Sequence, residues 1–486
     1  MNPEELTRKQ ALAKLVAELD QLYPLGSYDA TALKDEKGMP DFVTARNGHE
    51  RQFAQKAKLA LRALAYAWTK EVPKLVIRVD AAAMDSLLRQ TVADLHAEGL
   101  FGVDDSANLT LLNQTIQQTL ENTRTDFTHS FPARTLGMEF ESPIIVGPVT
   151  FMTRDQWINT VDFSEHAKNT SPGGQQENLE WKAALRHALS KPAAVQETEA
   201  PLPWLAAQMY GPLSASRSLL RVSLSGYERS LSKKAARQIC KTALDGLSLM
   251  LRGTALGGND LFHQQTLGDE RMPPVAHHTL IESNGFLYLP GYGLNKQIGG
   301  IDARKAKAMV EQGGMLPKLD ALAHILDALV SPESHLHPQL AMRWSMALDW
   351  LAEGEREASE AIALAKIGTS LDVLTEGGKF AGILNMLTHL TGWKEDSEFM
   401  VGANPRTLRW LVKELYDHGR SKILHGNVFD RLQSFAEMRI VGASLARIAL
   451  IECAMRLKHY TGEDTSKALR TIPRAVTESD AVTSES

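Results

Sequence analysis

The sequence predicts a mainly α-helical protein with a minor β component, in which a mixed α/β N-terminal region precedes a C-terminal four-helix bundle. Apolar residues recur at helical spacing over much of the chain, above all after residue 335. Two stretches, 135–153 and 277–293, interrupt that spacing with glycines, prolines and short apolar runs that are typical of strands and turns. The length of 486 residues predicts more than one domain.

The composition is that of a soluble globular protein, with 43% hydrophobic and 23% charged residues. The net charge of −5 excludes a general basic field, so any contact with RNA must be local. The two cysteines, Cys240 and Cys453, form no CxxC pair, which argues against a disulfide framework or a cysteine-ligated zinc. With no signal peptide and no apolar run of about 18 residues, we expect a cytoplasmic protein that does not enter a membrane.

Residues 1–130 are expected to form a helical N-terminal region. Apolar positions from Leu6 to Leu22 lie near one helical face, and Pro24 ends the pattern. Segments with helix-favouring composition and periodic apolar positions follow at 49–71, 80–98 and 106–124.

Residues 131–330 are expected to form a mixed α+β region. The stretch 135–153 predicts two short strands, and Asn284-Gly285 between two apolar runs predicts a hairpin. Helices are predicted over 177–190 and 302–330, and the long stretch 204–256 is also compatible with helix.

Residues 335–462 predict four helical segments, and the Thr-, Ser- and Glu-rich stretch 463–486 predicts a disordered tail. The four segments are 338–353, 355–376, 405–425 and 428–460.

The break between the last two segments places a histidine at a helix end. Gly426 suits the left-handed residue after a helix, and Asn427 suits the N-cap of the next one, with Asp430 as a partial capping box. Arg420 precedes His425 by five positions, so on a straight α-helix the two side chains point about 140° apart. Either the helix is bent near Gly419 or a second chain completes any site that uses both residues.

These residues resemble a known motif. Arg420-Ser421, three further residues and His425-Gly426, placed before the last helix of a helical unit, look like the HEPN family, and particularly its Apea-like branch, whose motif is an arginine, four to six residues and a histidine. The flanking 413–417 (KELYD) is similar too. Residues 370–374 (SLDVL) resemble the family's Ala-Leu-Glu-x-Leu, although Asp372 replaces the glutamate. Residues 146–151 (VGPVTF) are similar to a strand in N-terminal regions of Apea-type phage-defence proteins.

The resemblance implies a metal-independent endoribonuclease that works as a homodimer without a cofactor. It implies an effector of a bacterial antiphage, abortive-infection system that cuts RNA such as tRNA, while the first 330 residues respond to a phage-derived trigger. In this chemistry the 2′-hydroxyl attacks its own phosphate, leaving a 2′,3′-cyclic phosphate and a 5′-hydroxyl. His425 is suited to proton transfer, and Arg420 to binding the phosphoryl oxygens.

Supporting roles follow for four residues, and each has a structural alternative. Asp372 could brace Arg420 or be an ordinary helix charge, and Lys422 could hold a flanking phosphate or be a solvated lysine. Ser421 and Asn427 could orient phosphate or imidazole, or serve only as a helix residue and a cap. The alternative for the whole unit is a non-catalytic dimerisation or binding module with a regulatory role.

Overall fold

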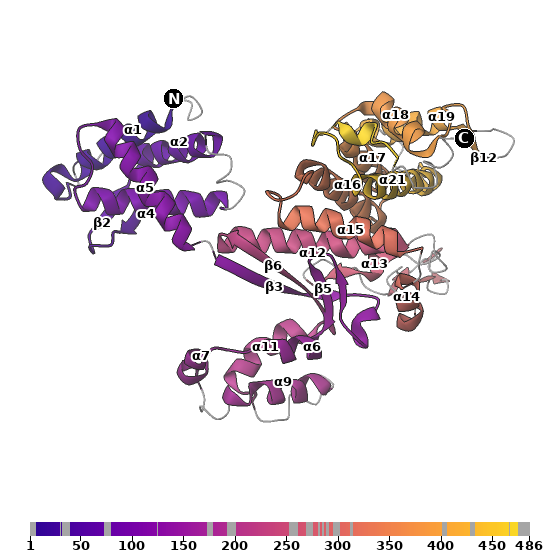
Figure 1. Ribbon diagram of the computed structural model, residues 1–486, viewed down its shortest axis with the longest axis horizontal. Coiled ribbons are helices and arrows are strands. Elements are labelled where there is room, and N and C mark those ends of the chain that lie inside the picture. Colours follow the sequence, from indigo (N-terminus) through magenta and orange to yellow (C-terminus); the bar gives the residue numbers. More distant parts are fainter. Residues whose placement is uncertain are drawn as a thin grey trace, which may run out of the picture. The chain divides into compact units, whose positions relative to one another are not determined.

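The computed structural model divides into two compact units (Figure 1). Unit 1 comprises residues 1–129 and 223–236, and unit 2 comprises 130–222 and 237–486. The structure describes residues 6–29, 31, 39–71, 79–123, 125–172, 178–191, 201–251, 261–268, 276–279, 282–283, 286–287, 291–294, 302–311, 314–400, 406–427, 433–465 and 467–474. The expectation of a mainly α-helical protein with a minor β component is confirmed.

Unit 1 packs its helices around an apolar core beside a short β-hairpin. The helices are α1 (Arg8–Leu22), α2 (Gln55–Glu71), α4 (Ala81–Ala97) and α5 (Asp105–Thr123). Leucines at helical spacing, such as Leu12, Leu15 and Leu19, are buried in the core. Strands β1 (Asp41–Thr44) and β2 (Glu50–Phe53) pair antiparallel. The helix predicted over 49–71 therefore begins later than expected, because its first residues form β2.

A five-stranded sheet with the order β4-β5-β6-β3-β7 follows. Its strands are β3 (Thr125–Arg134), β4 (Ile144–Val146), β5 (Val149–Thr153), β6 (Ser218–Tyr227) and β7 (Thr266–Leu267). The two strands predicted within 135–153 are confirmed as the antiparallel pair β4–β5. The same part of the chain contains η4 (Met138–Phe140), α6 (Arg154–Thr160), α7 (Glu165–Thr170), α9 (Trp181–Ser190), α11 (Trp204–Ser214), α12 (Arg229–Leu251) and α13 (Leu261–Gln264).

The helical interpretation of 204–256 was wrong for β6. Along this strand Leu220, Val222 and Leu224 are buried, whereas Ser223 and Ser225 between and after them are exposed. That two-residue alternation is the signature of a strand with one buried face. Helices α11 and α12 flank it on either side in the sequence.

The hairpin predicted around Asn284-Gly285 is confirmed by its strands. Strand β9 (Glu282–Ser283) pairs antiparallel with β10 (Phe286–Leu287), and β8 (Ala276–Thr279) pairs with β11 (Gly291–Leu294). Asn284 and Gly285 themselves lie outside the described residues. Helices α14 (Ala303–Val310) and α15 (Leu316–Val330) then occupy the predicted helical stretch 302–330.

The C-terminal part is helical, with more elements than the sequence predicted. Its elements are α16 (Pro338–Arg356), α17 (Glu360–Leu374), α18 (Lys379–Thr391), β12 (Glu398–Met400), β13 (Arg406–Thr407), α19 (Leu408–Lys413), η5 (Glu414–Ser421), α20 (Lys422–Leu424), α21 (Ala436–Leu457) and η6 (Ala468–Arg470). Helix α18 was not predicted. It begins directly after the Gly377-Gly378 break, at Lys379 with a positive φ of 54°.

The last long helix begins later than the sequence predicted. Its first residue is Ala436, and the Glu360 carboxylate accepts hydrogen bonds from the Phe435 N–H (2.8 Å) and the Ser434 hydroxyl (3.0 Å) just before it. An anion at a helix N-terminus is stabilising, and these bonds lower the pKa of Glu360. Asn427 is therefore not the N-cap of this helix, and Asp430 lies outside the described residues.

The disordered tail predicted over 463–486 was wrong for its first part. Asp464 accepts the N–H groups of Gln339 and Leu340 at the start of α16 (2.9 and 3.0 Å), and Leu469 and Ile472 are fully buried. Residues 475–486 lie outside the described residues. None of the helices in the described part of the chain combines the length and apolar composition needed to cross a membrane.

Candidate functional site

The helix that carries Arg420 changes its winding at the predicted motif. Between α19 and α20 the segment η5 is a π-helix, and the Lys422 N–H donates to the Asp417 carbonyl five residues back. The His425 N–H returns to the α-helical pattern and donates to the Ser421 carbonyl (3.1 Å). The angle of a straight α-helix therefore does not apply between the two residues. Short π-helical segments are rare and occur frequently at functional sites.

Two glycines bring this π-helix against α17. A Cβ atom added to Gly368 would lie 2.9 Å from the Arg420 Cβ, and one added to Gly419 would lie 3.0 Å from the Leu364 side chain. Real Cβ atoms essentially never show the first distance, so a side chain at position 368 would require Arg420 to shift, and the second distance is tight enough that the Leu364 side chain would have to move slightly. The close approach places the start of the Arg420 side chain directly on α17.

The Arg420 guanidinium is anchored by Asp372, the carboxylate predicted from the sequence to brace it. Arg420 Nη2 lies 3.1 Å from Asp372 Oδ2, so the short aspartate side chain reaches the guanidinium. The other carboxylate oxygen, Oδ1, accepts the Lys379 N–H (3.2 Å), and Asp372 is only 6% exposed. The aspartate is thus held from two sides, by the start of α18 and by Arg420.

Tyr416 supports the guanidinium from one turn earlier. The Arg420 guanidinium carbon lies 5.6 Å from the centre of the Tyr416 ring, and Nη1 lies 3.5 Å from its hydroxyl, a long hydrogen bond. The Arg420 side chain keeps 28% of its surface exposed, and its Nε is buried without a partner among the described residues. Arginine offers five N–H donors, so Asp372 and Tyr416 do not exhaust its capacity to bind an anion.

His425 ends the short helix α20, with its side chain exposed to solvent. Gly426 has the predicted left-handed conformation, with φ of 70°. The Gly426 N–H donates to the Ile423 carbonyl (3.1 Å) and the Asn427 N–H to the Lys422 carbonyl (2.8 Å), which together form a Schellman motif. This local motif fixes the backbone that carries the imidazole.

The predicted site residues are only partly brought together within one chain. Asp372 and Arg420 are in contact, whereas no hydrogen bond or ion pair among the described residues joins Arg420 to His425. Lys422 and Asn427 are exposed, and Ser421 is half-buried.

Two residues near Arg420 were not given roles from the sequence. Tyr416 contacts the guanidinium, and His418 Nδ1 lies 2.5 Å from Glu414 Oε2 with 45% of the His418 side chain exposed. In each pair the partners are four residues apart, the spacing that brings side chains together on a helical face. This four-residue spacing is the feature of the sequence from which both contacts could have been predicted.

Two histidines, His335 and His337, support the start of α16. The His337 N–H donates to His335 Nδ1 (3.2 Å), and His337 Nε2 lies 2.9 Å from the Gly462 carbonyl oxygen. In the part of the chain that the structure describes, no group of three or more His, Cys, Asp or Glu side chains is arranged to hold a metal ion.

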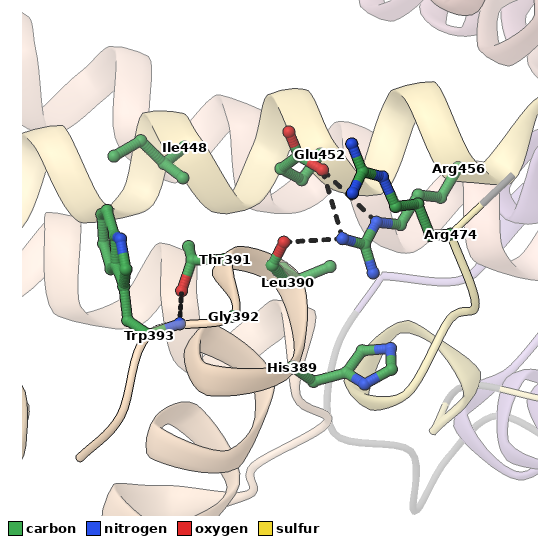
Figure 2. Close-up of a pocket in the computed structure, with 9 residues that line it drawn as sticks. All are labelled: His389, Leu390, Thr391, Gly392, Trp393, Ile448, Glu452, Arg456 and Arg474. Carbon is green, nitrogen blue, oxygen red and sulfur yellow. Dashed lines mark hydrogen bonds and ion pairs between the residues drawn. The ribbon is translucent and has the colours of Figure 1, made fainter. Parts of the chain in front are cut away.

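A cavity of about 470 Å³ lies elsewhere in unit 2 (Figure 2). Arg456 in its wall donates to the carbonyls of Leu390 (2.6 Å) and Ile472 (3.0 Å) and pairs with Glu452 (3.3 Å). Through these bonds the Arg456 guanidinium, on α21, links α18 and the segment after η6 to this helix. Arg420, Asp372 and His425 do not line this cavity.

Comparisons with protein-family models, with curated protein sequences and with solved structures found no match to this chain.

Proposed function

We propose that the C-terminal helical part of unit 2 is a metal-independent endoribonuclease of the HEPN type, with Arg420 as the phosphate ligand and His425 as the proton-transfer residue. The observation that carries the proposal is the anchored guanidinium. Asp372 and Tyr416 hold Arg420 on a π-helix, and a solvent-exposed imidazole follows five residues later at a helix end. An arginine placed by packing but with donors to spare is suited to an anion that arrives from solution.

The chemistry requires no group beyond those of the protein and the RNA. The 2′-hydroxyl oxygen forms a bond to the adjacent phosphorus as the bond to the 5′-oxygen breaks, which leaves a 2′,3′-cyclic phosphate and a 5′-hydroxyl. His425 takes the proton of the 2′-hydroxyl or delivers one to the leaving 5′-oxygen. Arg420 donates hydrogen bonds to the phosphoryl oxygens, whose charge grows in the transition state.

We propose that two copies of the chain form the working site, so that acid and base come from two histidines. This fits the absence of a bond between Arg420 and His425 in the described residues of one chain. Leu424 adjoins His425 and leaves 59% of its surface exposed. An interface with a second copy of the chain would cover this exposed apolar side chain. In this arrangement Lys422 would hold a flanking phosphate, and Ser421 and Asn427 would orient the reacting groups.

For the cell, we propose an effector of an abortive-infection type of antiphage defence that cuts RNA such as tRNA. The residues before 335 would respond to a phage-derived trigger. This part of the proposal rests on the motif resemblance alone.

The test compares the wild type with Arg420→Ala and His425→Ala in bacteria that express each chain. The wild type is expected to arrest growth and leave RNA fragments with cyclic phosphate ends, and both variants are expected to lose both effects. Arg409→Ala is the matched control, because Arg409 is an exposed arginine of α19 that pairs with Glu395. Equal behaviour of all chains at equal expression would favour a non-catalytic binding module instead.

His418→Ala separates the two exposed histidines of this segment. If His425 performs the proton transfer, His418→Ala retains cleavage. Loss of cleavage in His418→Ala and retention in His425→Ala would move the chemistry to the Glu414–His418 pair.

A further inference from the structure

Unit 1 contains an arginine that is buried without a carboxylate partner. Arg51 on β2 is only 4% exposed, yet no ion pair to it is formed among the described residues. Its Nε donates to His96 Nδ1 (2.8 Å) and its Nη1 to the Glu50 carbonyl (2.9 Å). The third nitrogen, Nη2, has no hydrogen-bond partner among these residues. Burying a cation is costly unless a negative group compensates it, and burial lowers the pKa of Arg51.

The groups around Arg51 do not supply that compensation directly. The guanidinium carbon lies 4.3 Å from the centre of the Tyr23 ring, and burial raises the pKa of the Tyr23 phenol, so the ring is neutral at neutral pH. Burial and Arg51 lower the pKa of His96, which is therefore neutral as well. Its Nδ1 accepts from Arg51, so its Nε2 carries the hydrogen and donates to Asp20 Oδ1 (3.1 Å). The Asp20 carboxylate is separated from Arg51 by this imidazole and is 69% exposed.

Arg51 lines a pocket of about 540 Å³, the size of a small-molecule site. His96 forms part of the wall, and two further polar side chains, Ser27 and His49, are exposed at its edge. Phe101 adds an aromatic surface. The pocket thus combines one buried cation, two rim donors and the Phe101 ring with the mostly exposed Asp20 carboxylate.

We infer that this pocket binds the phosphate group of a small molecule, with Arg51 as its principal ligand and Ser27 and His49 as rim contacts. A phosphate oxygen would occupy the free Nη2 donor and supply the missing negative charge in a place shielded from solvent. The pocket is larger than one phosphate ion, and Phe101 offers contact for an organic part. The inference does not depend on the nuclease proposal, because every residue involved lies in unit 1.

The test is isothermal titration calorimetry of the full chain with inorganic phosphate and, separately, with adenosine monophosphate at constant ionic strength. Phosphate-dependent heat is expected for both probes, with tighter binding of the monophosphate if the wall contacts the organic part. Tighter binding of inorganic phosphate would identify the free ion as the ligand. No heat from either probe at about 10 mM would overturn the inference.

Two variants locate the site. Arg51→Lys is expected to weaken binding about tenfold or more, because the ammonium cannot reproduce the guanidinium geometry. Asp20→Asn is expected to tighten binding severalfold, because it removes a negative charge from the rim and keeps the oxygen that accepts from His96. Asp20 is mostly exposed, so this variant is informative even if Arg51→Lys does not fold.

Arg46→Lys is the matched control. Arg46 is an exposed arginine that pairs with Asp94 and does not line the pocket. Its variant is expected to bind phosphate as the wild type does. Weaker binding in Asp20→Asn, or equal loss in Arg46→Lys and Arg51→Lys, would place the phosphate elsewhere and overturn the assignment.

Discussion

We expect the ion pair between Asp372 and Arg420 to contribute to the free energy of unfolding, which can be measured without any substrate. At 3.1 Å the two charges attract each other by roughly 5 kcal/mol at an effective dielectric constant near 20. Desolvation of Asp372 and the 28% exposure of the Arg420 side chain reduce the net value. We expect a coupling free energy of about 1–2 kcal/mol between the two side chains.

A double-mutant cycle measures that coupling. Asp372→Asn keeps an oxygen that can accept the Lys379 N–H and removes the charge, and Arg420→Gln removes the partner cation. The free energy of unfolding in urea is measured for the wild type, the two single variants and the double variant. The coupling is the difference between the effect of the double substitution and the sum of the two single effects. A coupling within about 0.3 kcal/mol of zero would refute the view that Asp372 anchors Arg420.

Further predictions concern packing, pH and the buried thiols. Gly368→Ala is expected to lower the free energy of unfolding by about 1–3 kcal/mol and to reduce RNA cleavage, because its methyl group would meet the Arg420 Cβ; unchanged urea midpoint and cleavage would contradict the close packing. Burial lowers the pKa of His324 from 6.5 to about 4. Between these two pH values the unfolded chain binds a proton at His324 and the folded chain does not. The associated stability is present above pH 6.5 and is lost as the pH falls toward about 4; His324→Gln is expected to flatten the pH profile of thermal unfolding in this window, and a profile parallel to that of the wild type would contradict the assignment. Cys240 and Cys453 are fully buried, and burial raises the pKa of each thiol to about 12; a thiol reagent is therefore expected to label them only in urea, and rapid labelling of the folded chain would be inconsistent with this packing.

Features set by neighbouring residues in the sequence could be predicted. The left-handed Gly426, the β4–β5 pair and the β9–β10 pair each depend on a short stretch that contains its own turn residues. Strand β6 was missed although its alternation is local, because its leucines and valine also suit a helix and helices flank it on both sides.

Features set by distant contacts could not be predicted in this way. The start of α21 depends on Glu360, more than seventy residues earlier. The position of residues 467–474 depends on the burial of Leu469 and Ile472 and on the hydrogen bond from Arg456 to the Ile472 carbonyl. The π-helix around Arg420 likewise accompanies its close packing on Gly368 and Leu364. The sequence suggested the candidate pair Arg420 and His425, but it did not indicate that Tyr416 would support the guanidinium.

We propose above all that Arg420 and His425 promote attack by the RNA's own 2′-hydroxyl. The most direct measurement uses purified protein, EDTA and an RNA oligonucleotide whose cut site has been mapped. A single 2′-deoxy nucleotide on the 5′ side of that site is expected to abolish cleavage there, while the all-RNA strand yields a cyclic phosphate end. Cleavage of the deoxy-substituted linkage at the same rate, or cleavage of the all-RNA strand by Arg420→Ala and His425→Ala at the wild-type rate, would contradict the account.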